Sequence, residues 1–172
     1  MRNKFVIILV LLFCHSLTYG QRTQSYNDME TLWSTAENLY KLGMYVPAQK
    51  LFAEILMHEG PEYSAYKDDA AYYIAICSMN LFNRDAEYQI SSFIEEHPES
   101  QNSNDAAFQM ANYYFRIRKY KDALEWYEKT DRMNLTKDEQ SEYFLKTGFS
   151  HFARSDFDRA AKAFYESKED NT

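Results

Sequence analysis

The side chains that could do chemistry in this sequence are scattered rather than grouped. His58, His97 and His151 lie far apart along the chain, and none has a metal-ligand spacing to a neighbour. Adjacent carboxylates could act as general acids or bases, but they are more typical of solvated faces and helix starts. Two such pairs are Asp68-Asp69 and Glu95-Glu96. The sequence has no glycine-rich phosphate loop, no His-Glu-x-x-His and no paired-cysteine zinc pattern. We therefore expect a protein that is not an enzyme and uses no cofactor or metal.

Residues 1–20 have the pattern of a secretory signal peptide. Two basic residues precede the apolar run Phe5–Phe13, and Thr18 and Gly20 provide small residues before an expected cleavage after Gly20. The run is shorter than the roughly 20 apolar residues that cross a bilayer. We expect no membrane span in the mature chain, with a retained N-terminal anchor helix as the alternative.

The two cysteines raise different questions. Cys14 follows the apolar run, where a bacterial lipid anchor would sit, but the bulky Phe13 before it fits a lipoprotein signal poorly. After cleavage Cys77 is the one cysteine left, so no internal disulfide can form. Its setting, Ile74-Ala75-Ile76, predicts a small buried side chain in a helix.

The chain is acidic and rich in aromatic residues. Cleavage removes Arg2 and Lys4 and no acidic residue, so the net charge changes from −7 to −9. Such a surface repels phosphates, so neither nucleic acid nor anionic lipid is expected as a partner. Gly and Pro number only 4 and 3, too few for the turns of a β-sandwich or barrel. The aromatic content of 17% argues against disorder. The composition therefore predicts an all-α protein.

A fourfold internal repeat is the strongest pattern in the sequence. Ala48, Ala86, Ala123 and Ala160 recur at spacings of 38, 37 and 37 residues. In three of the four, an aromatic residue lies three residues before the Ala and another lies four residues after it. Twelve residues before three of these positions lie further small residues: Ala36, Ala111 and Gly148. Two antiparallel helices per repeat explain the pattern, because small residues let helices approach and aromatic residues fill the volume beside them.

Cap and turn residues divide the expected helices. The segment Thr136–Glu139 matches a capping box that starts a helix. Gly43 and Asn83 are expected at helix ends, and Pro47 suits the first turn of a helix. The expected linkers between repeats are Pro61–Ser64 and Pro98–Ser103.

These residues resemble the tetratricopeptide repeat (TPR) family, which has a small residue in the first helix and an Ala flanked by aromatic residues in the second. The matching positions are Ala36, Leu39, Gly43, Tyr45, Ala48, Phe52 and, one place late, Pro61 in the first repeat; Ala86 and Pro98 in the divergent second; Ala111, Tyr114, Tyr120, Ala123 and Tyr127 in the third; and Gly148, His151, Phe157, Ala160 and Phe164 in the fourth. The spacing exceeds the family's usual period of about 34 residues. The resemblance implies an α-solenoid of about four helix-turn-helix repeats, approximately 29–62, 67–100, 104–137 and 141–172, after a short linker at 21–28.

The resemblance also implies a concave groove lined by the first helix of each repeat. The partner-binding residues carried over from it are Trp33, Glu37, Tyr40, Tyr73, Ile76, Phe108, Asn112, Phe115, Leu145, Phe149 and Phe152. Aromatic side chains are common anchors in such sites. The alternative is that these rings pack between neighbouring helices, and exposure is expected above all for Trp33 and Tyr40. The carboxylate-binding clamp of the chaperone-binding branch is not expected, because its positions are mostly aromatic or acidic here.

Three functions follow from this pattern. The first is a non-enzymatic scaffold or adaptor that binds a protein partner in the periplasm or at the outer-membrane periphery of a Gram-negative bacterium, because Phe93–Ser100 followed by Asp105-Ala-Ala resembles envelope members of the TPR family. The second is the N-terminal segment of a larger exported repeat protein with a structural or envelope-assembly role. The third is a carbohydrate or small-ligand binder that uses the aromatic groove.

Overall fold

The computed structural model describes residues 28–169, and within that range the chain is helical with no strand. A first helix includes residues 28–41. The elements after it are α2 (Tyr45–Met57), α3 (Pro61–Asn80), α4 (Ala86–Glu96), α5 (Asn102–Arg116), α6 (Tyr120–Lys129), the 3-10 turn η1 (Arg132–Asn134), α7 (Lys137–Ala153) and α8 (Phe157–Glu169). The expected signal peptide, its cleavage after Gly20 and the Cys14 anchor lie outside the described residues. The all-α prediction is confirmed.

The helices belong to two compact units that divide between Ala70 and Ala71, inside α3. Unit 1 contains the helix at 28–41, α2 and the first half of α3. Its core includes Ala36, Ala48 and Phe52, each fully buried. The small residues of the repeat pattern therefore lie where two helices meet.

Trp33 and Tyr40 lie in unit 1 and are half-buried rather than exposed. The Trp33 ring centroid lies 5.4 Å from that of Phe52 and 5.2 Å from that of Tyr66, and Tyr40 packs edge-on against Tyr45 at 5.7 Å. The expectation of exposure was wrong, because Phe52 of α2 and Tyr66 of α3 pack on Trp33, and Tyr45 of α2 packs on Tyr40.

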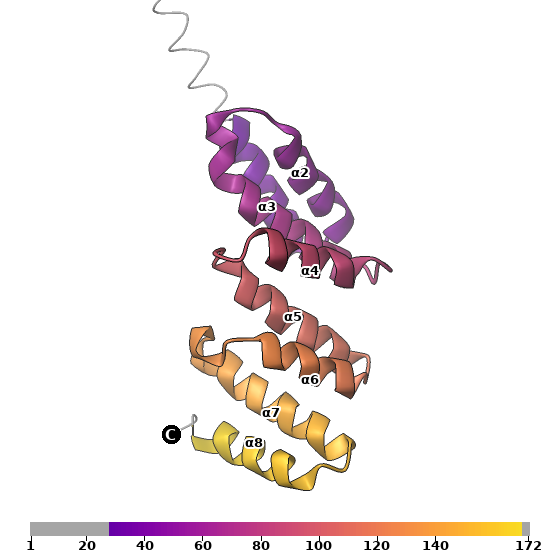
Figure 1. Cartoon of the computed structure of the whole chain (residues 1–172). Helices are drawn as coiled ribbons and strands as arrows, with labels where there is room; N and C mark the ends of the chain where they lie inside the picture. The colour runs from indigo at the N-terminus through magenta and orange to yellow at the C-terminus, as the bar shows by residue number, and fades with distance from the viewer. Residues whose placement is uncertain (1–27, 170–172) are drawn as a thin grey trace, which may run out of the picture. The chain divides into compact units, whose positions relative to one another are not determined.

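In unit 2, helices α4 to α8 follow one another, and each runs back along the one before it (Figure 1). Helix α5 packs most extensively on α6, and α7 on α8; α4 also contacts α5, and α6 contacts α7. The repeated Ala86, Ala123 and Ala160 are all at most 3% exposed. A Cβ added to Gly148 would lie 2.7 Å from Cδ1 of Phe164, so α7 and α8 approach closely only because position 148 has no side chain.

Each helix pair turns through one residue in the left-handed region. These residues are Gly43 (φ 72°), Phe82 (φ 57°), Arg118 (φ 62°) and Ser155 (φ 62°). All four turns make the same two backbone hydrogen bonds; at Arg118, for example, its N–H donates to the carbonyl of Phe115 and the next N–H donates to that of Tyr114. The paired bonds match a Schellman helix end. The turns thus repeat in the backbone as well as in the side chains.

Local predictions were partly right. Thr136 accepts a hydrogen bond from the Glu139 N–H at 3.3 Å, and Glu139 accepts one from the Thr136 N–H at 2.8 Å, which confirms the capping box. Pro61–Ser64 is not a linker, because Pro61 begins α3; proline is favoured at the first helical position, where no N–H donor is required. Asn83 lies in the turn that follows the end of α3 at Asn80, and the left-handed residue of that turn is Phe82.

Candidate functional site

A cavity of about 420 Å³ opens on the face of unit 2 that α5 and α7 share with the end of α3. Its lining residues are Met79 and Asn80 of α3, Gln109, Asn112, Tyr113, Phe115 and Arg116 of α5, and Glu142 and Lys146 of α7. On α5 the spacings of three and four residues place Gln109, Asn112 and Arg116 in one stripe. The cavity is thus built by the first helices of three successive pairs.

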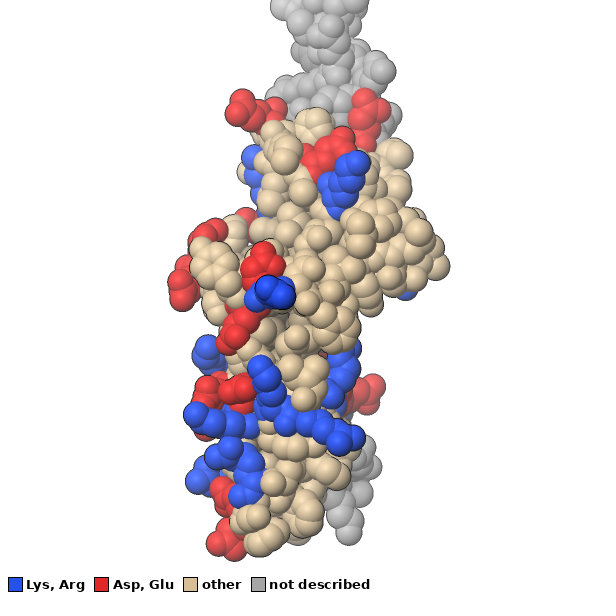
Figure 2. Space-filling view, turned by 90° about the vertical axis from the view of Figure 1, so that its right-hand side faces the viewer, with Lys and Arg blue, Asp and Glu red and all other residues tan. Residues whose placement is uncertain are grey.

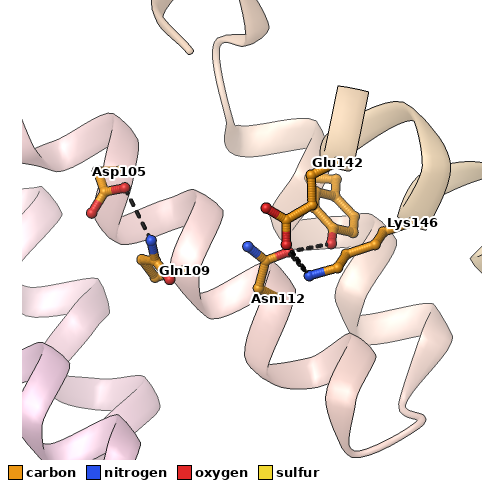
Figure 3. A network of polar contacts seen from close by, with 6 residues as sticks. Asp105, Gln109, Asn112, Glu142 and Lys146 are labelled. Carbon is orange, nitrogen blue, oxygen red and sulfur yellow. Dashed lines mark hydrogen bonds and ion pairs between the residues drawn. The ribbon is translucent and has the colours of Figure 1, made fainter. Parts of the chain in front are cut away.

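Asn112 is the central polar residue of this cavity (Figure 3). Its Oδ1 accepts a hydrogen bond from the Tyr127 hydroxyl at 2.7 Å and another from Lys146 Nζ at 3.1 Å. The Lys146 ammonium also pairs with the Glu142 carboxylate. Burial, followed by the charge of Glu142, raises the pKa of Tyr127, so its hydroxyl stays protonated and donates.

Two donors on one oxygen fix the orientation of the Asn112 amide. Its Nδ2 makes no hydrogen bond to any residue in the described part of the chain. Since Lys146 has only donors to offer, the oxygen must face Lys146 and the NH₂ group must face the other way. The cavity therefore presents a fixed hydrogen-bond donor to a carbonyl or carboxylate oxygen.

Aromatic side chains continue from the cavity along α7. The Phe115 ring lies 6.3 Å from that of Phe149, edge to face, and Phe149 lies 6.5 Å from Phe152. Phe149 is 50% exposed and Phe152 54%. Lys146 Nζ also lies 5.6 Å from the Phe115 ring centroid. An apolar surface thus adjoins the fixed amide.

The structure places the sequence-predicted groove residues in several different surroundings. Asn112 and Phe115 line the cavity, and Leu145, Phe149 and Phe152 are exposed on α7. Ile76 and Phe108 are each 1% exposed and belong to the core, so they do not line a groove in this structure. Tyr73 is half-buried with its ring 5.1 Å from Tyr72. In unit 1, Trp33 and Tyr40 pack on other rings, and Glu37 pairs with Lys41 at 2.9 Å.

Sequence reasoning missed much of the polar lining of the cavity. The missed residues are Asn80, Gln109, Tyr113, Arg116 and Lys146. The four-residue spacing of Glu142 and Lys146 is a signal for an ion pair on one helix face and could have found Lys146. Arg116 lies 5.3 Å over the ring of Phe82, a contact between two turns that only the packed structure reveals.

The titratable groups considered in the sequence do not gather into a site. Within residues 28–169 no group of three or more His, Cys, Asp or Glu side chains is arranged to hold a metal ion. His151 lies 3.4 Å from Asp156, and burial lowers its pKa despite that carboxylate. Burial also raises the pKa of Cys77 to about 12, so the thiol is protonated and inert at neutral pH. None of the described helices is long and apolar enough to cross a membrane.

These features define an all-α protein of antiparallel helix pairs with a polar and aromatic cavity on one face of unit 2. No protein-family model matches the sequence, and no curated protein is significantly similar to it.

Proposed function

We propose that this protein is a non-enzymatic interaction scaffold, a TPR-like helical array of the cell envelope, which binds a segment of a protein partner in the cavity of unit 2. The observation that carries the proposal is the Asn112 amide, fixed by Tyr127 and Lys146 beside the exposed rings of Phe149 and Phe152. A peptide segment presents carbonyl acceptors and apolar side chains, and this surface offers a partner to each.

Two further observations support the TPR-like part of the proposal. The repeated Ala residues are buried in both units, and the four helix turns share one backbone geometry. The envelope location is supported by the signal-peptide pattern of residues 1–20 and by the resemblance of Phe93–Ser100 to envelope members of the family. The periplasm or the outer-membrane periphery of a Gram-negative bacterium is the proposed compartment.

A photo-crosslinking experiment tests the proposed surface. A benzophenone amino acid replaces Phe149, on the aromatic surface next to the cavity, or, as the control, Tyr88, which lies on α4 and is 73% exposed. In envelope preparations we expect a discrete crosslinked product from position 149 and none from position 88. Equal crosslinking from both positions would show that α7 is not a specific binding surface.

The substitution Asn112→Asp tests the fixed donor. A carboxylate keeps the acceptor for Tyr127 and Lys146 but has no NH₂ group. We expect unchanged helicity and about tenfold weaker binding of the crosslinked partner, the loss expected for one hydrogen bond. Unchanged affinity would remove Asn112 from the binding surface.

A further inference from the structure

Unit 2 contains a second cavity, of about 200 Å³, bounded by η1, α7 and α8. It shares no lining residue with the cavity around Asn112. Three cationic side chains line it, Arg132, Arg159 and Lys162, against one carboxylate, Glu166. This is an unusual concentration of positive charge in a chain whose net charge is −7.

Comparison with the preceding helix pair explains why the cavity exists. Thr147 and Ala163 line it, and the residues 37 positions earlier are Met110 and Trp126, which are 0% and 4% exposed. In α5 and α6 two large apolar side chains thus occupy the positions that a small hydroxyl and a methyl group hold in α7 and α8. Phe144, which also lines the cavity, stands at the position of Ala107.

The charges at these positions are also reversed between the two pairs. Arg159 corresponds to Asp122 and Lys162 to Glu125 at the same 37-residue spacing. Figure 2 looks onto the side of unit 2 where the α5–α6 and α7–α8 turns lie, and there Lys and Arg side chains gather, with Asp and Glu among them, at the level of α6 to α8. The pair α7–α8 therefore combines a cavity with positive charges at positions where the pair α5–α6 has negative ones.

Internal partners neutralise only part of this charge. Arg132 Nη1 lies 3.6 Å from Glu166 Oε2, and Arg159 Nε lies 2.9 Å from Asp156 Oδ2, which leaves the terminal nitrogens of Arg159 available. Lys162 makes no ion pair with the described residues. Thr147 Oγ1 is buried and makes no hydrogen bond within that part of the chain, although a buried hydroxyl normally has a partner.

We propose that this cavity binds a phosphate-class oxyanion, either free phosphate or the phosphate group of a small monoester. Guanidinium groups match the planar acceptor pairs of phosphate, and a lysine adds donors. A tetrahedral dianion offers more acceptor oxygens than a carboxylate does, which suits three cations. Phe144, whose ring lies 5.6 Å below the Arg132 guanidinium, supplies an apolar wall for the organic part of a monoester.

Isothermal titration calorimetry and amide NMR shifts on the full mature chain test this site. Inorganic phosphate and phenyl phosphate are titrated separately, against chloride at equal ionic strength. We expect saturable binding of phosphate and none of chloride, with shifts centred on α7 and α8. Tighter binding of phenyl phosphate would identify a monoester as the natural ligand, and equal or weaker binding would identify free phosphate. Identical responses to phosphate and chloride would overturn the proposal.

Three variants separate a built site from general surface charge. Lys162→Glu restores the residue type of the preceding pair and is expected to weaken phosphate binding about tenfold or more. Lys50→Glu makes the same charge change at an exposed position of α2 and should leave binding unchanged. Ala163→Trp refills the cavity without altering any charge and should abolish binding. Equal effects of the two lysine variants, or phosphate binding retained by a folded Ala163→Trp protein, would contradict the site. If Ala163→Trp does not fold, the lysine pair still decides.

Discussion

Helices α5 and α6 form the same kind of pair as α7 and α8, but corresponding side chains have different surroundings. Phe108 in α5 is 1% exposed, and Leu145, 37 residues later in α7, is 53% exposed. Tyr127 in α6 is 1% exposed, and its counterpart Phe164 is only half-buried. Among the described helices, the pair α5–α6 has neighbours on both sides, α4 and α7, whereas the pair α7–α8 has a neighbour on one side. A repeat position is therefore core or surface according to what packs next to it.

The largest expected difference between the two pairs concerns this burial. Phe108→Ala should lower the free energy of unfolding by about 3–5 kcal/mol, because it removes a fully buried ring and leaves a cavity. Leu145→Ala should cost less than about 1 kcal/mol, because the side chain is already half in water. Urea unfolding followed by circular dichroism measures both. Similar losses for the two variants would mean that Leu145 is covered in solution.

The close approach of α7 and α8 gives the next effect. Gly148→Ala should destabilise the protein by about 1–2 kcal/mol, because the new Cβ meets the Phe164 ring at 2.7 Å and the ring must move. The corresponding residue of α5 is Ala111, so the first pair accommodates a methyl group there. A smaller side chain at position 164 should relieve the clash. The double variant Gly148→Ala, Phe164→Leu is therefore expected to lose less free energy of unfolding than the sum of the losses of the two single variants.

The N-termini of α5 and α7, the first helix of each pair, differ in how they are capped. Thr136 caps α7 with its side chain, whereas Gln101 before α5 makes no side-chain capping bond. Thr136→Ala should cost about 1 kcal/mol, and Gln101→Ala close to nothing. Thermal unfolding of both variants checks the comparison. A loss at Gln101 equal to that at Thr136 would show that the capping box contributes little.

Glycine substitutions in the turns of the two pairs are expected to change the free energy of unfolding by similar amounts, the smallest of the effects predicted here. Arg118 and Ser155 both have φ 62°, a conformation that glycine adopts at lower cost. Arg118→Gly and Ser155→Gly should each raise the free energy of unfolding by about 0.5–1 kcal/mol, partly offset by greater freedom of the unfolded chain. A destabilising result at only one position would show that the side chain there contributes more than its backbone strain.

Much of the fold could be predicted because its signals are local. Ala123, Ala160 and the Thr136 cap act within one helix pair, and their spacing is visible in the sequence. The boundary at Pro61 was misjudged because proline both ends and begins helices, and the pattern alone does not separate the two uses.

The candidate site was harder to predict than the fold. Asn112 and Phe115 were found by their place in the repeat, but Arg116 and Lys146 depend on contacts between elements. Phe108 and Ile76 were misplaced because burial depends on the neighbouring helices rather than on the residue's own helix. The cavity bounded by η1, α7 and α8 could not be predicted from the repeat pattern, because it arises from residues that differ between repeats rather than from those that repeats share.

The shared left-handed turns have a consequence for how this chain tolerates insertions. Three of the four turns join their helices with the same three-residue connection, whereas the connections between pairs differ: 58–60, 97–101 and 130–136. One residue added at Arg118 would rotate α6 by about 100° relative to α5 and carry Ala123 off the packed face. A residue added between pairs would lengthen a connection that already varies. Changes in chain length should therefore accumulate at the joints between hairpins and be excluded from the hairpins themselves.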